Sequence, residues 1–182
     1  MTEVKIENIV ATTLIANELD IEKVRKYLKG GEFSPERFPG LIYHTLKPKS
    51  AVLLFRSGKL VCTGTKNIDD VKTVINGIVR TLKKHKFDVL AKPQIQVQNI
   101  VASADLKNNL DLVKLSLTFG VERIEYEPEQ FPGLVYRMKS PKIVTLIFSS
   151  GKIVLTGGTN IGDVKNAVEI LKKDLTEAGF LR

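Results

Sequence analysis

The pattern of hydrophobic and polar positions along the chain predicts short, largely apolar strand-like runs, separated by stretches of helical periodicity. Residues 5–14 have the pattern of a strand, and residues 17–29 place apolar side chains at helical spacing. Three strand-like segments follow at 41–46, 51–56 and 59–65, separated by the turn sequences KPKS and SG. Because such short connections join antiparallel neighbours, we expect an antiparallel meander here.

The segment after this meander carries clear signals for the start and end of a helix. Asn67 suits an N-cap position, and Asp69 and Asp70 favour the first turn, while lysines cluster in the last turn. A second segment of the same kind begins at Asn160. We expect a long helix in each place.

The whole pattern occurs twice along the chain. The sequence FPGLIYHTLKPKSAVLLFRSGKLVCTG begins at Phe38, and FPGLVYRMKSPKIVTLIFSSGKIVLTG begins 93 residues later at Phe131. The sequences NIVAT at Asn8 and NIVAS at Asn99 also match, at a spacing of 91 residues. Two copies of about 90 residues indicate a duplicated unit. We therefore expect two repeats, 1–91 and 92–182, that form one antiparallel sheet with the helices on one face, an α+β fold.

Both faces of the predicted strands are apolar, although a sheet covered on one side normally exposes a polar face. In the strand 59–65, Leu60 and Cys62 share one face, and Val61 and Thr63 share the other. Two explanations remain open. Either further helices or a homodimer cover the second face, or a partner rich in acceptors and negative charge binds it. The minor groove of A·T-rich DNA has acceptors on its floor and phosphates on its walls, and so fits the second explanation.

Composition and charge narrow the classes of function. The 182 residues are 43% hydrophobic and 26% charged, as in globular proteins, and the net charge of +8 favours an acidic partner such as nucleic acid. Cys62 is the single cysteine and there are two histidines, which argues against a disulfide or a metal site. The sequence has no apparent catalytic set or phosphate-binding loop, so we expect no enzyme and no cofactor. Acidic residues near the start and the lack of a long apolar run predict an intracellular protein.

The duplicated motifs FPGL, F-x-SGK-x-V-x-TG and NIVA resemble those of the TATA-box-binding protein family, in its archaeal form, over nearly all of the chain. The resemblance implies a saddle, in which two pseudo-twofold repeats form one curved antiparallel sheet with helices on the convex face. It also implies a general transcription factor that binds the minor groove of TATA-box DNA, kinks it, and recruits a transcription factor B type partner and RNA polymerase. Such a factor would act in the cytoplasm of an archaeal cell, at the nucleoid, or in a eukaryotic nucleus. The alternative is a protein-binding sheet module that does not contact DNA, and the free protein could form a homodimer.

The resemblance also implies roles for residues on the second face. Two pairs of aromatic side chains would be inserted between base steps: Phe38, Phe55, Phe131 and Phe148. Contacts to base edges would come from Asn8, Asn99, Val10, Val101, Leu53, Leu146, Val61, Val154, Thr63, Thr156, Pro39 and Pro132. Phosphates would be contacted by Arg56, Lys59, Arg137 and Lys152. His44 occupies the position that corresponds to Arg137, which would weaken this contact in the first repeat.

An acidic segment, VERIEYEPEQFPG, leads into Phe131 in the second repeat. Negative charge at a DNA-binding tip would oppose DNA affinity, so this segment is better interpreted as a protein-binding loop than as a DNA contact. In the family that the chain resembles, this loop contacts the transcription factor B type partner. Our candidates for that contact are Glu125, Glu127 and Glu129.

Overall fold

A computed structural model describes all 182 residues, which form two compact units. The N-terminal unit consists of Asn8–Gln98, and the C-terminal unit consists of Met1–Glu7 together with Asn99–Arg182. Strands β1 (Val4–Leu14) and β5 (Gln96–Asp105) each have residues in both units. Each unit therefore contains a few residues of the strand that mainly belongs to the other unit.

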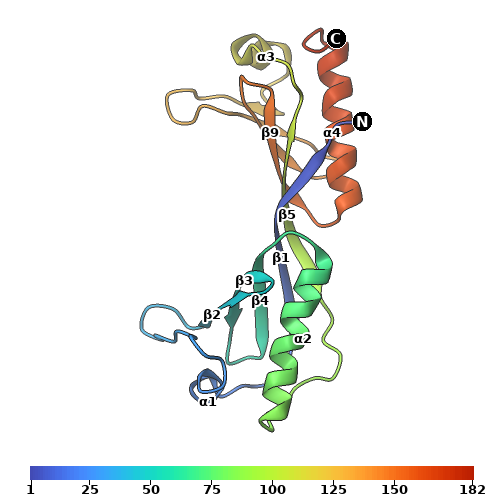
Figure 1. Cartoon of the computed structure of the whole chain (residues 1–182). Helices are drawn as coiled ribbons and strands as arrows, with labels where there is room; N and C mark the ends of the chain where they lie inside the picture. Colours follow the sequence, from blue (N-terminus) through green and yellow to red (C-terminus); the bar gives the residue numbers. More distant parts are fainter. The chain divides into compact units, whose positions relative to one another are not determined.

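In the N-terminal unit the strands are antiparallel neighbours in the order β2-β3-β4-β1 (Figure 1). Helix α1 is short, and α2 runs along one face of the strands. The bounds of these elements are α1 Ile21–Arg25, β2 Leu41–Leu46, β3 Lys49–Leu54, β4 Lys59–Thr65 and α2 Ile68–Lys84.

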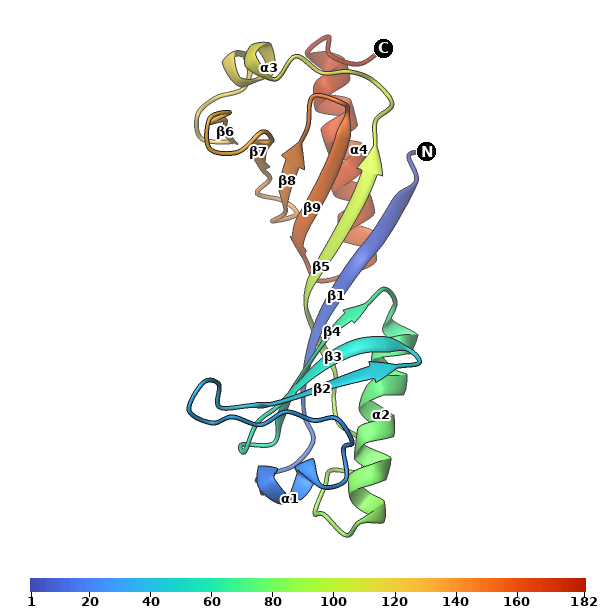
Figure 2. The ribbon, with the colours of Figure 1, turned by 60° about the vertical axis from the view of Figure 1, so that its left-hand side comes forward.

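The C-terminal unit repeats this plan, with the strand order β5-β9-β8-β7-β6 (Figure 2). Helix α4 lies behind β5 and β9 in this view. The bounds are α3 Leu112–Thr118, β6 Ile124–Glu125, β7 Leu134–Arg137, β8 Val144–Ile147, β9 Lys152–Gly158 and α4 Ile161–Glu177. The antiparallel strands and both long helices agree with the sequence pattern.

The side chains facing α2 and α4 form the core of each unit. In β4, Leu60 and Cys62 have no exposed surface, and they pack on the side of α2 that buries Val71 and Ile75. The corresponding residues of β9, Ile153 and Leu155, are equally buried. Burial raises the pKa of the Cys62 thiol to about 11. The long helices therefore cover the face that bears Leu60 and Cys62 in the first repeat. Among the helices, none combines the length and the hydropathy that a membrane span requires.

Two elements differ in their bounds from the sequence prediction. The helix predicted over 17–29 is only α1, because Asp20 accepts a hydrogen bond from the backbone N–H of Lys23 and so caps the helix there. The strand predicted over 51–56 is β3, which begins at Lys49, inside the predicted KPKS turn. It ends at Leu54, because the next residues form a turn in which Gly58 N–H donates a hydrogen bond to the backbone carbonyl of Phe55. Gly58 has a φ of +86° there, and an added Cβ would lie 1.9 Å from a backbone oxygen.

Candidate nucleic-acid interface

In each unit the strands have one face that the long helix leaves uncovered, which we call the open face of that unit. In the N-terminal unit one row across this face consists of Thr12, Val61, Leu53 and Ile42, in register on four strands. The matching row of the C-terminal unit consists of Ser103, Val154, Leu146 and Val135. All of these side chains are partly exposed. Most side chains in these rows are apolar and uncharged.

The structure places the predicted base-contacting residues on these faces. Val10 lies two residues before Thr12 on β1, and Val101 lies two residues before Ser103 on β5, so each valine shares the open face with that residue. Both valines are partly exposed. Four members of the rows were not among the residues predicted from the sequence: Thr12, Ile42, Ser103 and Val135. The signal was present, because Thr12 and Ser103 follow Val10 and Val101 at the strand period of two.

Asn8 and Asn99 are each held by an irregularity in the sheet. The register of β1 against β4 shifts between Ile9 and Ala11, opposite Thr63 and Gly64. The ladder does not pair the Gly64 N–H, and Asn8 Oδ1 accepts a 2.7 Å hydrogen bond from it. Asn8 Nδ2 donates to Thr63 Oγ1 at 3.0 Å. These bonds fix the orientation of the amide and leave one of its N–H groups available to a ligand.

The C-terminal unit repeats this arrangement. Asn99 Oδ1 accepts from Gly157 N–H at 2.6 Å, and Asn99 Nδ2 donates to Thr156 Oγ1 at 3.1 Å. Gly157 has a φ angle of +101° and Gly64 has one of +93°, a conformation that favours glycine. The TG dipeptide that ends each repeat motif therefore serves to position the asparagine.

The four predicted wedge residues form one aromatic pair in each unit. Phe38 and Phe55 meet edge to face with their ring centroids 5.8 Å apart, and Phe131 and Phe148 do so at 5.9 Å. Phe131 keeps 39% of its surface exposed, although large apolar side chains are normally buried. Pro39 and Pro132, beside the rings, are exposed as well.

The glycine of each FPG motif makes room for its aromatic pair. An added Cβ at Gly40 would lie 2.9 Å from both Phe38 and Phe55, and one at Gly133 would lie 2.6 Å from Phe131. Neither glycine has a positive φ. The sequence motif suggests a turn glycine, whereas the structure shows that the glycine is needed because the rings pack directly against its backbone.

Among the predicted phosphate contacts, Arg56, Lys59 and Lys152 are exposed and form no ion pair. Arg137 differs, because its Nη2 lies 3.3 Å from Glu125 Oε2. His44 is exposed and lies in register with Ala51, as Arg137 lies in register with Val144. The exposed cations are thus free to bind an anion, except that Arg137 already has an acidic neighbour.

The acidic loop is connected to the second aromatic pair. The backbone carbonyl of Glu127 accepts a 2.9 Å hydrogen bond from Phe131 N–H, just as Ser34 accepts from Phe38 N–H in the first repeat. The side chains of Glu127 and Glu129 are exposed. The same loop therefore holds Phe131 through its backbone and presents carboxylates to solvent.

Both repeats match the family model described as "Transcription factor TFIID (or TATA-binding protein, TBP)", over residues 3–85 and 94–178. The chain belongs to the TATA-binding protein family. It is 54% identical to the TATA-box-binding protein of Methanothrix thermoacetophila over 179 residues, 98% of each chain. It is 52% identical to that of Picrophilus torridus over 181 residues, 100% of this chain and 98% of the relative.

A solved structure of the TATA-binding protein family has the same fold. The structure titled "Methanococcus jannaschii TBP" matches with a TM-score of 0.89 at 45% identity, over 96% of this chain and 99% of that chain. The predicted fold class is therefore confirmed. Since this is a family of transcription factors, the expectation that the chain is not an enzyme is confirmed as well.

Proposed function

We propose that this chain is a general transcription factor that binds the minor groove of A·T-rich TATA-box promoter DNA through its two open faces, one from each proposed repeat, 1–91 and 92–182. The observation that carries the proposal is the bulge in each unit, where an asparagine amide held by a glycine N–H keeps a donor available on an apolar surface. The family of the chain and its archaeal relatives support the same function.

Base selection follows from the chemistry of the open faces. Asn8 and Asn99, with Thr63 and Thr156 beside them, donate to the acceptors of A·T and T·A pairs. The apolar side chains of the open faces offer no acceptor to the exocyclic amine of guanine. These side chains are Val10, Val61, Leu53, Val101, Val154 and Leu146. A G·C pair under such a side chain leaves a buried polar group unpaired, which costs binding free energy.

The aromatic pairs kink the DNA in this proposal. Unstacking a base step costs a few kcal/mol, and the additional contacts that bent DNA makes with the protein offset this cost. Phe131 and Phe38 suit this role because Phe131 is exposed, Phe38 is partly exposed, and each ring is held edge to face against a partner ring. Pro39 and Pro132 restrict the backbone next to them.

The exposed cations Arg56, Lys59 and Lys152 contact phosphates on either side of the groove, and Arg137 contributes in the second repeat. The carboxylates Glu125, Glu127 and Glu129 bind a transcription factor B type partner, which brings RNA polymerase to the promoter. The implied location is the nucleoid of an archaeal cell.

A binding assay with two duplexes of equal length tests the proposal. We expect the affinity for the A·T-rich duplex to be at least roughly tenfold higher than for the G·C-rich one, because the acceptors on the groove floor decide the affinity. Fluorescence transfer between dyes on the two DNA ends reports the bend. Equal binding to both duplexes, or none, would favour the alternative of a protein-binding sheet module.

A further inference from the structure

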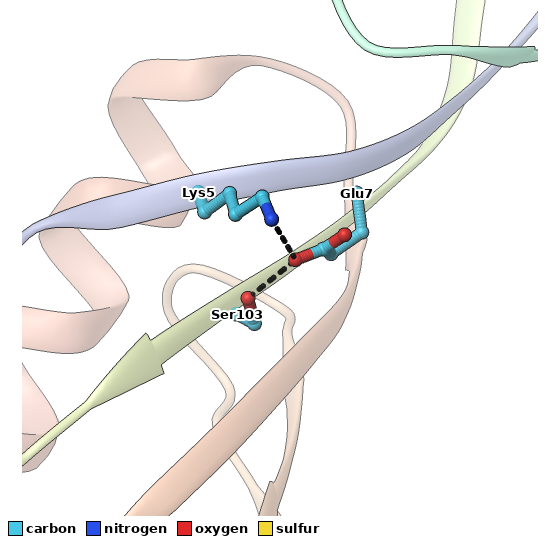
Figure 3. A network of polar contacts seen from close by, with 3 residues as sticks. All are labelled: Lys5, Glu7 and Ser103. Atoms are coloured by element: carbon cyan, nitrogen blue, oxygen red, sulfur yellow. Dashed lines mark hydrogen bonds and ion pairs between the residues drawn. The ribbon is translucent and has the colours of Figure 1, made fainter.

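The two repeats differ at the polar position directly before the NIVA motif that each of them contains. Glu7 precedes Asn8, and the corresponding Gln98 precedes Asn99. Glu7 Oε1 accepts a 2.7 Å hydrogen bond from Ser103 Oγ and lies 3.9 Å from Lys5 Nζ (Figure 3). Equivalent positions of the two open faces thus carry a carboxylate in one unit and an amide in the other.

Gln98 occupies the matching place in the N-terminal unit. Its Nε2 donates at 2.9 Å to Thr12 Oγ1, and Thr12 is the counterpart of Ser103. The two contacts are therefore equivalent in position but opposite in direction, because the hydroxyl accepts from Gln98 and donates to Glu7. This reversal leaves the two open faces with different hydrogen-bonding properties.

The Glu7 carboxylate belongs to the open face of the C-terminal unit. Ser103 is in register with Val154 on that face, and Glu7, Ser103, Val154 and Phe148 line one hollow. The side chain of Glu7 keeps 37% of its surface exposed. Both of its contacts are made by Oε1, so Oε2 is free to accept a hydrogen bond from a molecule bound on this face.

We infer that Glu7 makes one base-pair position selective for guanine, in the half of the DNA site that the C-terminal unit contacts. This inference rests on the proposed function. The guanine amine is the one donor that the minor-groove floor presents, and A·T pairs present acceptors alone. An ionised carboxylate can only accept, so it is complementary to the amine and is repelled by A·T acceptors.

The consequence is a preferred orientation on the promoter. The aromatic pairs and the asparagine bulges are nearly the same in the two units, so they do not distinguish the two ends of an A·T-rich site. Glu7 and Gln98 do distinguish them. On a site with a G·C pair in one half, the C-terminal unit binds the half that contains guanine.

Duplexes with single substitutions test this inference directly. At each position of an A·T-rich site, one A·T pair is replaced by G·C or by inosine·C, which keeps the pairing but lacks the N2 amine. For the unchanged protein we expect one position where G·C binds roughly tenfold more tightly than inosine·C, and the reverse preference elsewhere. Glu7→Gln abolishes the preference for G·C at that position, and Gln98→Glu creates a second one in the other half of the site.

Glutamate and glutamine have nearly the same size, so both variants should keep the fold of the unchanged protein. Thermal unfolding of the two variants measures this. If no position prefers G·C over inosine·C in the unchanged protein, the inference is wrong. It is also wrong if Glu7→Gln raises the affinity for every duplex by one common factor, because the carboxylate would then act only by repelling phosphates. A protein that does not discriminate A·T-rich from G·C-rich duplexes contradicts the proposed function itself, which separates the two failures.

Discussion

Arg137 Nη2 and Glu125 Oε2 lie 3.3 Å apart, so the ion pair joins a candidate phosphate contact to a candidate partner contact. Both side chains are more than half exposed, and such surface pairs contribute about 0 to 1 kcal/mol to stability. The first repeat has no such pair, because its corresponding residues are Glu32 and His44. We therefore expect the pair to affect the proposed binding more than folding.

Glu125→Gln should increase the affinity for A·T-rich DNA by a few-fold, since it frees Arg137 for phosphate and removes a nearby negative charge. A salt titration of DNA binding measures the effect, and the slope of affinity against salt should become steeper. Glu32→Gln is the matched control, and it should change the affinity less. An unchanged affinity and slope for Glu125→Gln would mean that Arg137 does not contact phosphate.

Gly133→Ala should reduce DNA bending, because its Cβ would lie 2.6 Å from Phe131 and force the ring out of place. Gly40→Ala should have a weaker effect, since its nearest ring atoms are 2.9 Å away. Phe131→Ala removes the wedge altogether and should give the largest loss of fluorescence transfer between labelled DNA ends.

Gly77→Ala serves as the control for these exchanges, because nothing lies within 4 Å of the added Cβ on α2. It should leave the bend unchanged and increase stability by about 1 kcal/mol. A normal bend with Phe131→Ala would contradict the wedge role of the aromatic pair.

Much of this fold could be predicted from sequence because its signals are local. The apolar strand-like runs, the asparagine caps of α2 and α4 and the repeated motifs all lie within short stretches. What could not be predicted depends on contacts between distant residues. The sequence does not show that Phe55 packs over Gly40, or that Ser103 bonds to Glu7, 96 residues away. The sequence prediction of an apolar second face did not include Glu7 for this reason.

Asn8→Asp should separate the two roles of the amide. The aspartate can still accept from Gly64 N–H, so the bulge should persist and thermal stability should change little. It has no N–H to donate, so affinity for A·T-rich DNA should fall roughly tenfold or more. Asn99→Asp should behave in the same way.

Asn76→Asp makes the same change of charge on the exposed side of α2, and it should have little effect on DNA affinity. If Asn8→Asp and Asn76→Asp weaken binding equally, the loss would come from net charge and not from the missing donor.

The buried thiol of Cys62 predicts a pH dependence of stability. Its pKa rises from 9.0 to about 11 on folding, so the unfolded chain loses the proton first as the pH increases. The stabilisation is complete below pH 9, and between pH 9 and about 11 the free energy of unfolding should fall by about 2 kcal/mol more than in Cys62→Ala. Denaturant titrations at pH 8 and pH 10.5 measure the difference, and parallel losses in the two proteins would contradict it.

Glu127→Lys should separate partner binding from DNA binding. The backbone carbonyl of Glu127 holds Phe131 N–H whatever the side chain is, so the wedge and the bend should survive the exchange. The reversed charge should abolish the attraction to a basic partner surface, and it should slightly favour DNA. Ser34→Lys adds a cation at the corresponding place of the first repeat, and it should leave the partner bound. A shift assay that adds a transcription factor B type protein to the protein–DNA complex measures both steps. Loss of DNA binding together with partner binding in Glu127→Lys would show that this loop supports the DNA interface and is not a separate docking site.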